Sequence, residues 1–254
     1  MKIDFIIPSY CSKDLTSLAV RSFEKHKNQH DFNYIVVENS TDTSYRGHIK
    51  ALSPNVIWVQ NPETPNISQN GNIASVANAM AVEKGLEYVN TEYVFICHND
   101  VVACHENWLD FLVDKMKKHN LAAASYVLDN GRINALHISG ILVKTEVAKA
   151  VSMHPVYEDG KQLLDVGDSI TQYCRDNDLD YFFCRNTHND EAHVDLCEDV
   201  YKELAYVDRA LDDDGNVIFL HLGRGSVKTL GTYWKANRTT LDGWVEFVEK
   251  NILA

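Results

Sequence analysis

The sequence predicts an α/β fold in which helices flank a mostly parallel central sheet. Short apolar, β-rich runs recur at residues 3–8, 34–37, 56–59 and 93–97, and helical patterns separate several of them. Strands that alternate with helices favour right-handed crossovers and parallel pairing. Polar side chains follow three of these runs, at the strand ends where α/β sheets bind their ligands.

Composition agrees with one large domain and argues against several classes of protein. The chain has 254 residues, of which 45% are hydrophobic and 24% charged, as in ordinary globular proteins. Its net charge of −12 argues against nucleic-acid or anionic-membrane binding, which needs a basic face. No apolar run approaches the roughly 18 residues of a membrane helix, and no signal-type segment opens the sequence. Six cysteines without a Cys-x-x-Cys pair favour reduced thiols, so the expected location is the cytoplasm.

Between the four early strands the sequence predicts two helices. Ser12 can cap the first, in which apolar or small residues recur at helical spacing: Leu15, Leu18, Ala19, Ser22 and Phe23. The second should end near Gly85, and its expected buried face consists of Ile73, Val76, Ala77, Met80 and Ala81.

The later elements are expected with less regular spacing. A helix is predicted around Trp108, Leu109, Leu112 and Met116, followed by strands at 122–128 and 138–143. Thr145 can cap a short helix, and Asp168 or Ser169 can cap another that runs to about Asp176. Late strands are predicted at 181–184 and 217–221, and a closing helix carries Trp244, Phe247 and Val248 on one face. We expect one integrated domain with two functional halves, residues 1–102 and 103–254.

The polar strand ends predict a nucleotide site. They read Pro8-Ser9-Tyr10 after the first strand, Glu38 to Asp42 after the second and His98-Asn99-Asp100 after the fourth. If these strands are parallel, the three clusters share one edge and offer an aromatic ring, carboxylates and hydroxyls. The chain has neither a Gly-x-Gly-x-x-Gly nor a Gly-Lys-Ser/Thr loop to cradle phosphates. A divalent metal on the carboxylate of Asp100 would neutralise them instead.

These motifs resemble family 2 glycosyltransferases of the GT-A fold. The segments that carry the resemblance are 6–10, 34–42, 72–78 and 95–101, in the family's order over roughly the first 110 residues. Glu38 stands where the family has the first Asp of Val-Asp-Asn-Gly-Ser-Thr-Asp, and this segment is one residue shorter. His98 stands in the first position of the family's Asp-x-Asp, and a neutral imidazole binds Mn²⁺ less readily than a carboxylate does.

The resemblance implies a single GT-A-like domain whose first half binds a nucleotide-sugar donor and whose second half binds the acceptor and supplies the base. A UDP-sugar is favoured, with dTDP-, GDP- and CDP-sugars left open, and the acceptor is a hydroxyl of a glycan, lipid-linked molecule or protein. Asp100 would hold Mn²⁺ or Mg²⁺, and His98 would contact either ribose or metal. The residues implied to line the nucleotide are Pro8, Tyr10, Glu38, Asn72, His98 and Asn99.

In the second half, residues 163–169 resemble the family's acidic motif before an arginine-containing helix. The motif implies that Asp168, with Asp165 next in order, removes the proton from the acceptor hydroxyl in an inverting transfer. Asp168 could instead only cap its helix. Gly140 resembles the glycine near the acceptor.

The segment that follows the last predicted strand also resembles the family. His221 resembles the late histidine that contacts metal or diphosphate, and Arg224 and Ser226 suit a loop that closes over phosphates. A solvated hairpin is the other interpretation of this segment.

Other interpretations remain open at this point. A nucleotidyltransferase shares the site at the sheet edge but would want a basic loop after the first strand, and residues 11–14 match poorly. A catalytically inactive GT-A-like nucleotide-binding or scaffold protein would explain His98 and the shortened motif. A rival metal cluster, formed by His188, Asp190, Glu191, His193 and Asp195, lacks His-Glu-x-x-His spacing and is better interpreted as a polar loop.

Overall fold

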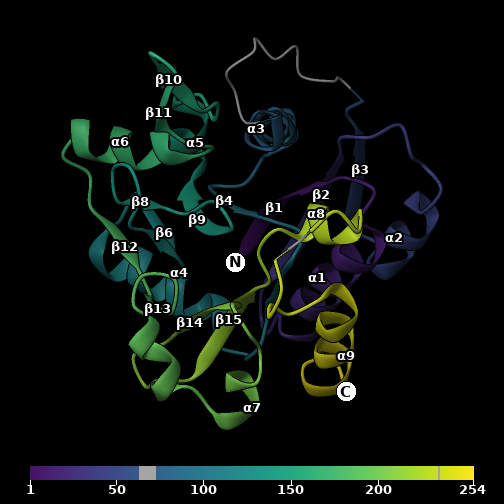
Figure 1. Cartoon of the computed structure of the whole chain (residues 1–254). Coiled ribbons are helices and arrows are strands. Elements are labelled where there is room, and N and C mark those ends of the chain that lie inside the picture. The colour runs from purple at the N-terminus through teal and green to yellow at the C-terminus, as the bar shows by residue number, and fades with distance from the viewer. Residues whose placement is uncertain (63–72, 234) are drawn as a thin grey trace.

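The computed structural model describes residues 1–62, 73–233 and 235–254, so Asn72 lies outside the described residues. A seven-stranded sheet in the order β12-β6-β9-β4-β1-β2-β3 forms its centre (Figure 1). Its strands are β1 (Lys2–Ser9), β2 (Asp31–Glu38), β3 (Val56–Gln60), β4 (Tyr93–Cys97), β6 (Ala123–Ser125), β9 (Gly140–Lys144) and β12 (Tyr181–Phe183). Only β9 runs antiparallel to its neighbours, β4 and β6. The predicted mostly parallel sheet is confirmed.

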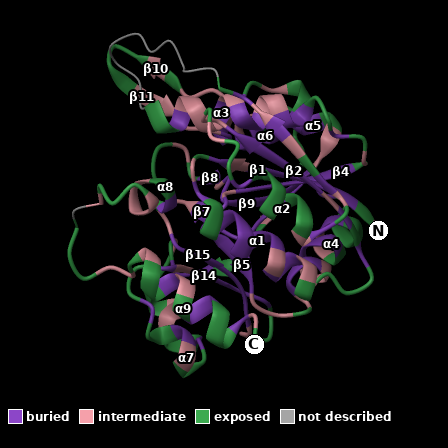
Figure 2. Cartoon of the chain, turned by 90° about the vertical axis from the view of Figure 1, so that its right-hand side faces the viewer, coloured by how far each residue is buried: buried purple, intermediate pink, exposed green. Residues whose placement is uncertain are grey.

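Helices cover both faces of this sheet because side chains alternate between them along each strand. One face packs against α1 (Lys13–Lys25), α2 (Arg46–Leu52) and α4 (Trp108–His119). The other packs against α3 (Ile73–Leu86), α5 (Thr145–Ala150) and α6 (Asp168–Asp176). Figure 2 shows the buried strands between these two groups of helices. None of the helices within the described residues has the length and apolarity to cross a membrane.

An aromatic cluster beneath the first face fixes β1 in place. The ring of Phe5 lies 4.6 Å from that of Phe32, 5.0 Å from Phe95 and 5.2 Å from Phe23, between ring centroids. All of these rings are fully or almost fully buried. Tilted and edge-on aromatic pairs add about 0.5–1.5 kcal/mol each beyond the area they bury. The central strands that carry the polar tips are therefore rigidly held.

A second, antiparallel sheet branches from the first directly after β4. It runs in the order β13-β14-β15-β5, with β5 (Val101–Ala103), β13 (Arg185–Asn186), β14 (Asp208–Leu211) and β15 (Val217–His221). Because β5 begins at Val101, residues 98–100 form the junction between the two sheets. Helix α9 (Leu241–Asn251) packs beneath this sheet and beside α1. The smaller elements are η1 (Glu191–Leu196), α7 (Asp199–Lys202), α8 (Gly225–Thr229) and the hairpins of β7 (Leu128–Asp129) with β8 (Ala135–Leu136) and β10 (Val156–Glu158) with β11 (Lys161–Leu164).

The predicted buried face of α3 is wrong. The helix buries Ser75, Ala79, Val82 and Leu86 and shares only Ala81 with the prediction, whereas Ile73 is 64% exposed. Apolar residues surround this helix almost completely, so periodicity could not select the side that packs on β1 and β2. The predicted faces of α1, α4 and α9 are confirmed.

Three predicted helix caps differ because their side chains have other partners. The hydroxyl of Ser12 donates to the carbonyl of Tyr10, although Ser12 holds the N-cap position of α1. Thr145 is the first residue of α5 and donates to the carbonyl of Thr91. Helix α6 is preceded by Gly167, with a left-handed φ of 79°, and neither Asp168 nor Ser169 caps it.

Several predicted strands have different limits, and β2 covers Asp31–Glu38 where the sequence predicts 34–37. The segment 122–128 forms β6 and β7 with a break between them, where the buried hydroxyl of Ser125 lies 3.0 Å from the carbonyl oxygens of Val127 and Gly140. The next strand, β9, starts at Gly140 instead of residue 138.

Candidate active site

The polar ends of β1, β2 and β4 meet at one edge of the central sheet, as predicted. Ser9 pairs with Glu38 in the parallel register of β1 and β2, and Ile6 of β1 pairs with Ile96 of β4. Parallel strands in register end at the same edge. Tyr10 and the 98–100 junction therefore follow neighbouring strands at this edge, and Glu38, predicted to follow β2, is the last residue of that strand.

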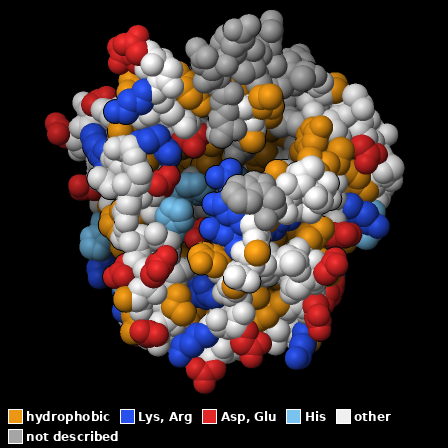
Figure 3. Space-filling view, viewed as in Figure 1, with side chains coloured by type: hydrophobic (Ala, Val, Ile, Leu, Met, Phe, Trp, Pro, Cys, Tyr) orange, Lys and Arg blue, Asp and Glu red, His pale blue; other side chains and the backbone are white. Residues whose placement is uncertain are grey.

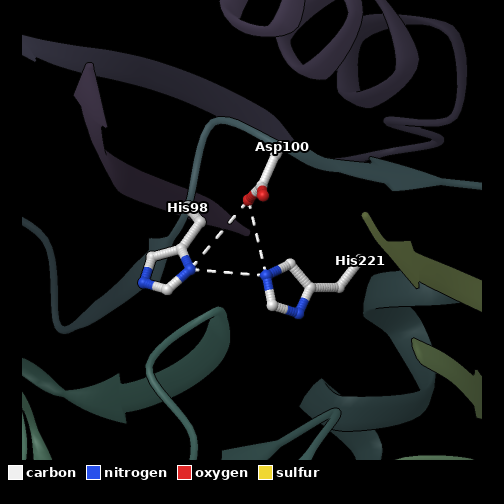
Figure 4. Close-up of side chains that lie close together, drawn as sticks. All are labelled: His98, Asp100 and His221. Atoms are coloured by element: carbon white, nitrogen blue, oxygen red, sulfur yellow. Dashed lines mark hydrogen bonds and ion pairs between the residues drawn. The ribbon is translucent and has the colours of Figure 1, made fainter. Parts of the chain in front are cut away.

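His98, Asp100 and His221 come together at the junction (Figure 4). The Nε2 of His221 lies 3.4 Å from Oδ1 of Asp100 and 3.5 Å from Nδ1 of His98. One ligand atom from each residue lies within 4.8 Å of the other two. Pairing of β15 with β5, which sets His221 opposite Val101, brings the late histidine beside the earlier pair.

Burial and neighbouring charges give the three residues of this cluster different protonation states. Burial lowers the pKa of His98 to about 4, which leaves a neutral imidazole. Burial also lowers the pKa of His221, but Asp100 and Asp208 outweigh it and raise that pKa to about 10. For Asp100 the raising effect of burial is outweighed by His221, His98 and the Gly225 N–H, which hold its pKa below the usual range. Asp100 is therefore a carboxylate at neutral pH.

The three side chains can serve as metal ligands. A buried amide oxygen beside them, Oδ1 of Asn78, supports this fit. The Nε2 of His98 lies 2.9 Å from Nδ2 of Asn78, whose buried Oδ1 has no hydrogen-bond partner among the described residues. Amide oxygen and nitrogen can exchange places by a simple flip. After a flip, Asn78 would accept the Nε2 proton of His98 and leave the Nδ1 lone pair of His98 facing the cluster. That is the form in which imidazole binds a metal.

The predicted nucleotide residues divide into exposed and buried ones. Tyr10 is 42% exposed and Pro8 is half-buried at the end of β1. Glu38 is fully buried, and its Oε1 accepts from the N–H groups of Cys11 and Ser40 at 3.1 and 3.0 Å. Its Oε2 accepts from the hydroxyl of Tyr45. Glu38 thus ties together the loops that follow β1 and β2.

Asn99 also points into the protein. It is 6% exposed, and its Nδ2 donates to the hydroxyl of Thr16 at 3.2 Å. The Thr16 hydroxyl in turn lies 3.1 Å from that of Ser9, which lies 3.0 Å from the Tyr45 hydroxyl. A buried polar network therefore supports the edge from below, between the 98–100 junction and Glu38.

We expect Tyr45→Phe to destabilise the protein by about 1–3 kcal/mol, because it leaves buried partners at Glu38 and Ser9 without a donor. Tyr45 is 4% exposed, whereas Tyr206 is 62% exposed and provides the matched control, Tyr206→Phe. Urea unfolding measures the free-energy difference. Equal stability of the two variants would show that the network does not brace the edge.

The predicted base residues lie around Arg132. The Oδ2 of Asp168 accepts from Nε of Arg132 and from the N–H of Asp165, both at 2.8 Å. The side chain of Asp168 is 3% exposed and that of Asp165 26% exposed. Burial raises the pKa of Asp168, although Arg132 opposes this shift. Burial is the largest effect on the pKa of His98 and lowers it, whereas the charge of Asp165 raises it. The Asp165 carboxylate therefore lies within electrostatic range of the cluster.

Arg224 and Ser226, which the sequence predicts to form a loop over phosphates, follow β15. The backbone N–H of Gly225 donates to Oδ2 of Asp100 at 2.8 Å, which places residues 222–226 against the cluster. Arg224 has a left-handed φ of 60°. The sequence did not indicate Lys228. Its Nζ lies 3.3 Å from the Leu222 carbonyl oxygen and interacts electrostatically with Asp100 and Asp208. In Figure 3, Lys and Arg side chains gather beside histidine at the centre of this face.

We expect Gly225→Ala to weaken Mn²⁺ binding by about tenfold or more, because outer contacts tune metal ligands. A Cβ at residue 225 would lie 2.6 Å from Cβ of Asp100 and 2.8 Å from Cδ1 of Leu15, so the carboxylate must move. Gly47→Ala is the control, since a Cβ there meets nothing within 4 Å. Calorimetric titration with Mn²⁺ tests this, and equal affinities would contradict it.

Gly140 has a packing reason to be glycine. A Cβ there would lie 2.6 Å from Cζ of Phe219 and 3.0 Å from Cδ2 of Tyr126. These two rings stack with centroids 4.2 Å apart. The glycine therefore lets an aromatic pair approach β9.

Sequence reasoning missed a second layer behind His221. The Nδ1 of His221 lies 2.9 Å from Oδ2 of Asp208, whose Oδ1 lies 3.3 Å from Nδ1 of His188. The predicted polar loop does contain Asp190, which caps η1 through the N–H of Ala192. His188, however, joins the site. No local signal marks Asp208, because only the pairing of β14 with β15 sets it opposite His221.

No protein-family model and no curated protein matches the chain. Among solved structures, it is similar to the mannosyltransferase PcManGT of Pyrobaculum calidifontis in complex with GDP-Man and Mn²⁺, with 16% identity, a TM-score of 0.46 and coverage of 58% of this chain and 46% of that one. It is also similar to S. aureus TarS 1-349 with UDP-GlcNAc, with 18% identity, a TM-score of 0.41 and coverage of 61% and 49%. A third is glucosyl-3-phosphoglycerate synthase of Mycobacterium tuberculosis with Mn²⁺, UDP-glucose and phosphoglyceric acid, with 13% identity, a TM-score of 0.48 and coverage of 72% and 69%. The chain spans about half the length of the first two.

Proposed function

We propose that this chain is a GT-A-type, metal-dependent glycosyltransferase that transfers a sugar from a nucleotide-diphosphate sugar to a hydroxyl acceptor. The observation that carries the proposal is the cluster of His98, Asp100 and His221 at the carboxyl edge of a mostly parallel sheet. Ligands of α/β sheets bind at this edge. Residues 1–102 form the donor half and residues 103–254 the acceptor half.

Asp100 and His221 would hold the metal, with His98 as the third ligand. A set with two imidazoles favours Mn²⁺ over Mg²⁺, which prefers oxygen ligands and several waters. When bound, the metal supplies positive charge next to the leaving diphosphate. Arg224, Ser226 and Lys228 contribute further donors from the loop and helix beside Asp100.

The donor nucleotide lies along the ends of β1 and β2. The exposed ring of Tyr10 stacks on the base, Pro8 lines it, and a UDP-sugar remains the favoured donor. The buried contacts of Glu38 and Asn99 support a bracing role for both, beneath the nucleotide.

The acceptor hydroxyl gives its proton to a carboxylate of the 165–168 segment. Its oxygen then forms a bond to the anomeric carbon as the bond from that carbon to the diphosphate breaks, and the electron pair leaves with the diphosphate. We assign the proton to Asp165, whose carboxylate is the more exposed one. Asp168 positions Arg132, and the transfer is inverting.

A donor screen tests the proposal. Nucleoside diphosphates with Mn²⁺ are expected to raise the melting temperature, since a ligand of the folded state stabilises it, and UDP should give the largest shift. The same nucleotides with a chelator should give smaller shifts. Slow Mn²⁺-dependent hydrolysis of a UDP-sugar would distinguish an enzyme from an inactive binding protein. The absence of any nucleotide shift would contradict the proposed donor site.

A further inference from the structure

The imidazole of His221 is held from behind by a carboxylate. Its Nε2 faces Asp100 and His98, while its Nδ1 lies 2.9 Å from Oδ2 of Asp208. Asp208 and His221 are opposite residues of the antiparallel pair β14–β15, so the backbone ladder fixes their separation. The side chain of His221 is 7% exposed and that of Asp208 22% exposed. The Nε2 of His221 is thus available to the cluster, while its Nδ1 is held by Asp208.

We infer that Asp208 is a positioning residue that fixes the tautomer and ring orientation of His221 for metal binding. The inference rests on the proposed metal-dependent function. A carboxylate that accepts the Nδ1 proton of an imidazole keeps that proton on Nδ1, so a metal that displaces the Nε2 proton of His221 would meet a lone pair of raised basicity. Asp208 itself touches no ligand of the proposed reaction, because it acts through His221.

A further layer holds Asp208. Its second oxygen, Oδ1, lies 3.3 Å from Nδ1 of His188. The Nε2 of His188 lies 3.9 Å from Oδ1 of Asp129, and Oδ2 of Asp129 accepts from Nη2 of Arg132 at 2.8 Å. Both Asp208 oxygens are therefore engaged, which removes the rotation that would release His221. The same chain of contacts ends at Arg132, the partner of Asp168.

Two substitutions of Asp208 separate positioning from charge. Asp208→Ala removes both the charge and the hydrogen-bond acceptor, whereas Asp208→Asn removes the charge and keeps an acceptor oxygen. Mn²⁺ is titrated into each protein without nucleotide, and the electron paramagnetic resonance signal of the free aqua ion reports binding. We expect Asp208→Ala to bind Mn²⁺ about 10- to 100-fold more weakly than the unsubstituted protein and Asp208→Asn to show a smaller loss.

The control is Asp213→Ala, which removes the same charge from the same β-hairpin. Asp213 has a side chain that is 70% exposed and pairs with Lys115, so Mn²⁺ affinity should not change. Equal losses for Asp208→Ala and Asp208→Asn, or affinities within twofold of the unsubstituted protein, would overturn the positioning role. Circular dichroism checks that each variant is folded.

A second variant keeps the test decisive if Asp208→Ala does not fold. His188→Gln removes the support of Oδ1 but leaves the Asp208–His221 contact, so we expect a loss larger than that of Asp213→Ala. An unchanged Mn²⁺ affinity would overturn the inference. Failure of the unsubstituted protein to bind Mn²⁺ would instead contradict the proposed metal dependence, and the inference with it.

Discussion

Asp100→Asn is expected to reduce Mn²⁺-dependent sugar transfer by about 10²–10³-fold, the size of effect seen when one electrostatic contact to a developing charge is removed. Asp100 is the only carboxylate in the three-residue cluster, and its side chain is 4% exposed. The asparagine oxygen can still accept from the Gly225 N–H, so the loop should remain in place while the negative charge is lost. Product formation measured across a range of Mn²⁺ concentrations gives the effect.

Asp199→Asn provides the matched control for this prediction. The side chain of Asp199 is 99% exposed and pairs only with Lys202 among the contacts of the described residues, so activity should be unchanged. Retention of full activity by Asp100→Asn at low Mn²⁺ concentration would contradict the role of Asp100 as a metal ligand. A melting curve of the substituted protein shows whether any loss comes from unfolding.

Asp165→Asn and Asp168→Asn are expected to fail in different ways. Asp165→Asn should reduce transfer by about 10²–10⁴-fold, the usual contribution of a general base, while Mn²⁺ affinity and stability stay nearly constant. Asp168→Asn should lower the free energy of unfolding by about 1–3 kcal/mol, because the buried side chain loses its charged contact with Arg132. Transfer kinetics and urea unfolding measure the two effects separately.

Asp176→Asn serves as the control for this pair, since Asp176 is exposed at the end of the same helix, α6. The reverse pattern would reassign the roles. If Asp168→Asn abolished transfer in a stable protein and Asp165→Asn retained it, Asp168 would be the base. Equal activity of all three variants would remove the base from this segment.

The central strands β1, β2 and β4 could be predicted because each is an apolar run that ends in or is followed by polar residues. The predicted limits of β4 and β15 agree with the structure to the residue. Short elements were missed: β5 has three residues and β14 four, too few for a periodic pattern. Helix α3 was located correctly, but its apolar surface on all sides hid which side packs.

Local patterns along the chain predict the α/β class, the parallel strands and the edge where polar residues gather, because the alternation of strands with helices and the composition of strand ends can be recognised in short segments. Tertiary structure alone decided that Asp208 and His188 stand behind His221, and that Arg132 joins Asp129 to Asp168. Those contacts join residues from different strands, hairpins and loops, and their positions follow from strand pairing and packing. The spacing of residues along the chain does not indicate which of them make these contacts. Burial and hydrogen bonding in the folded protein identify them.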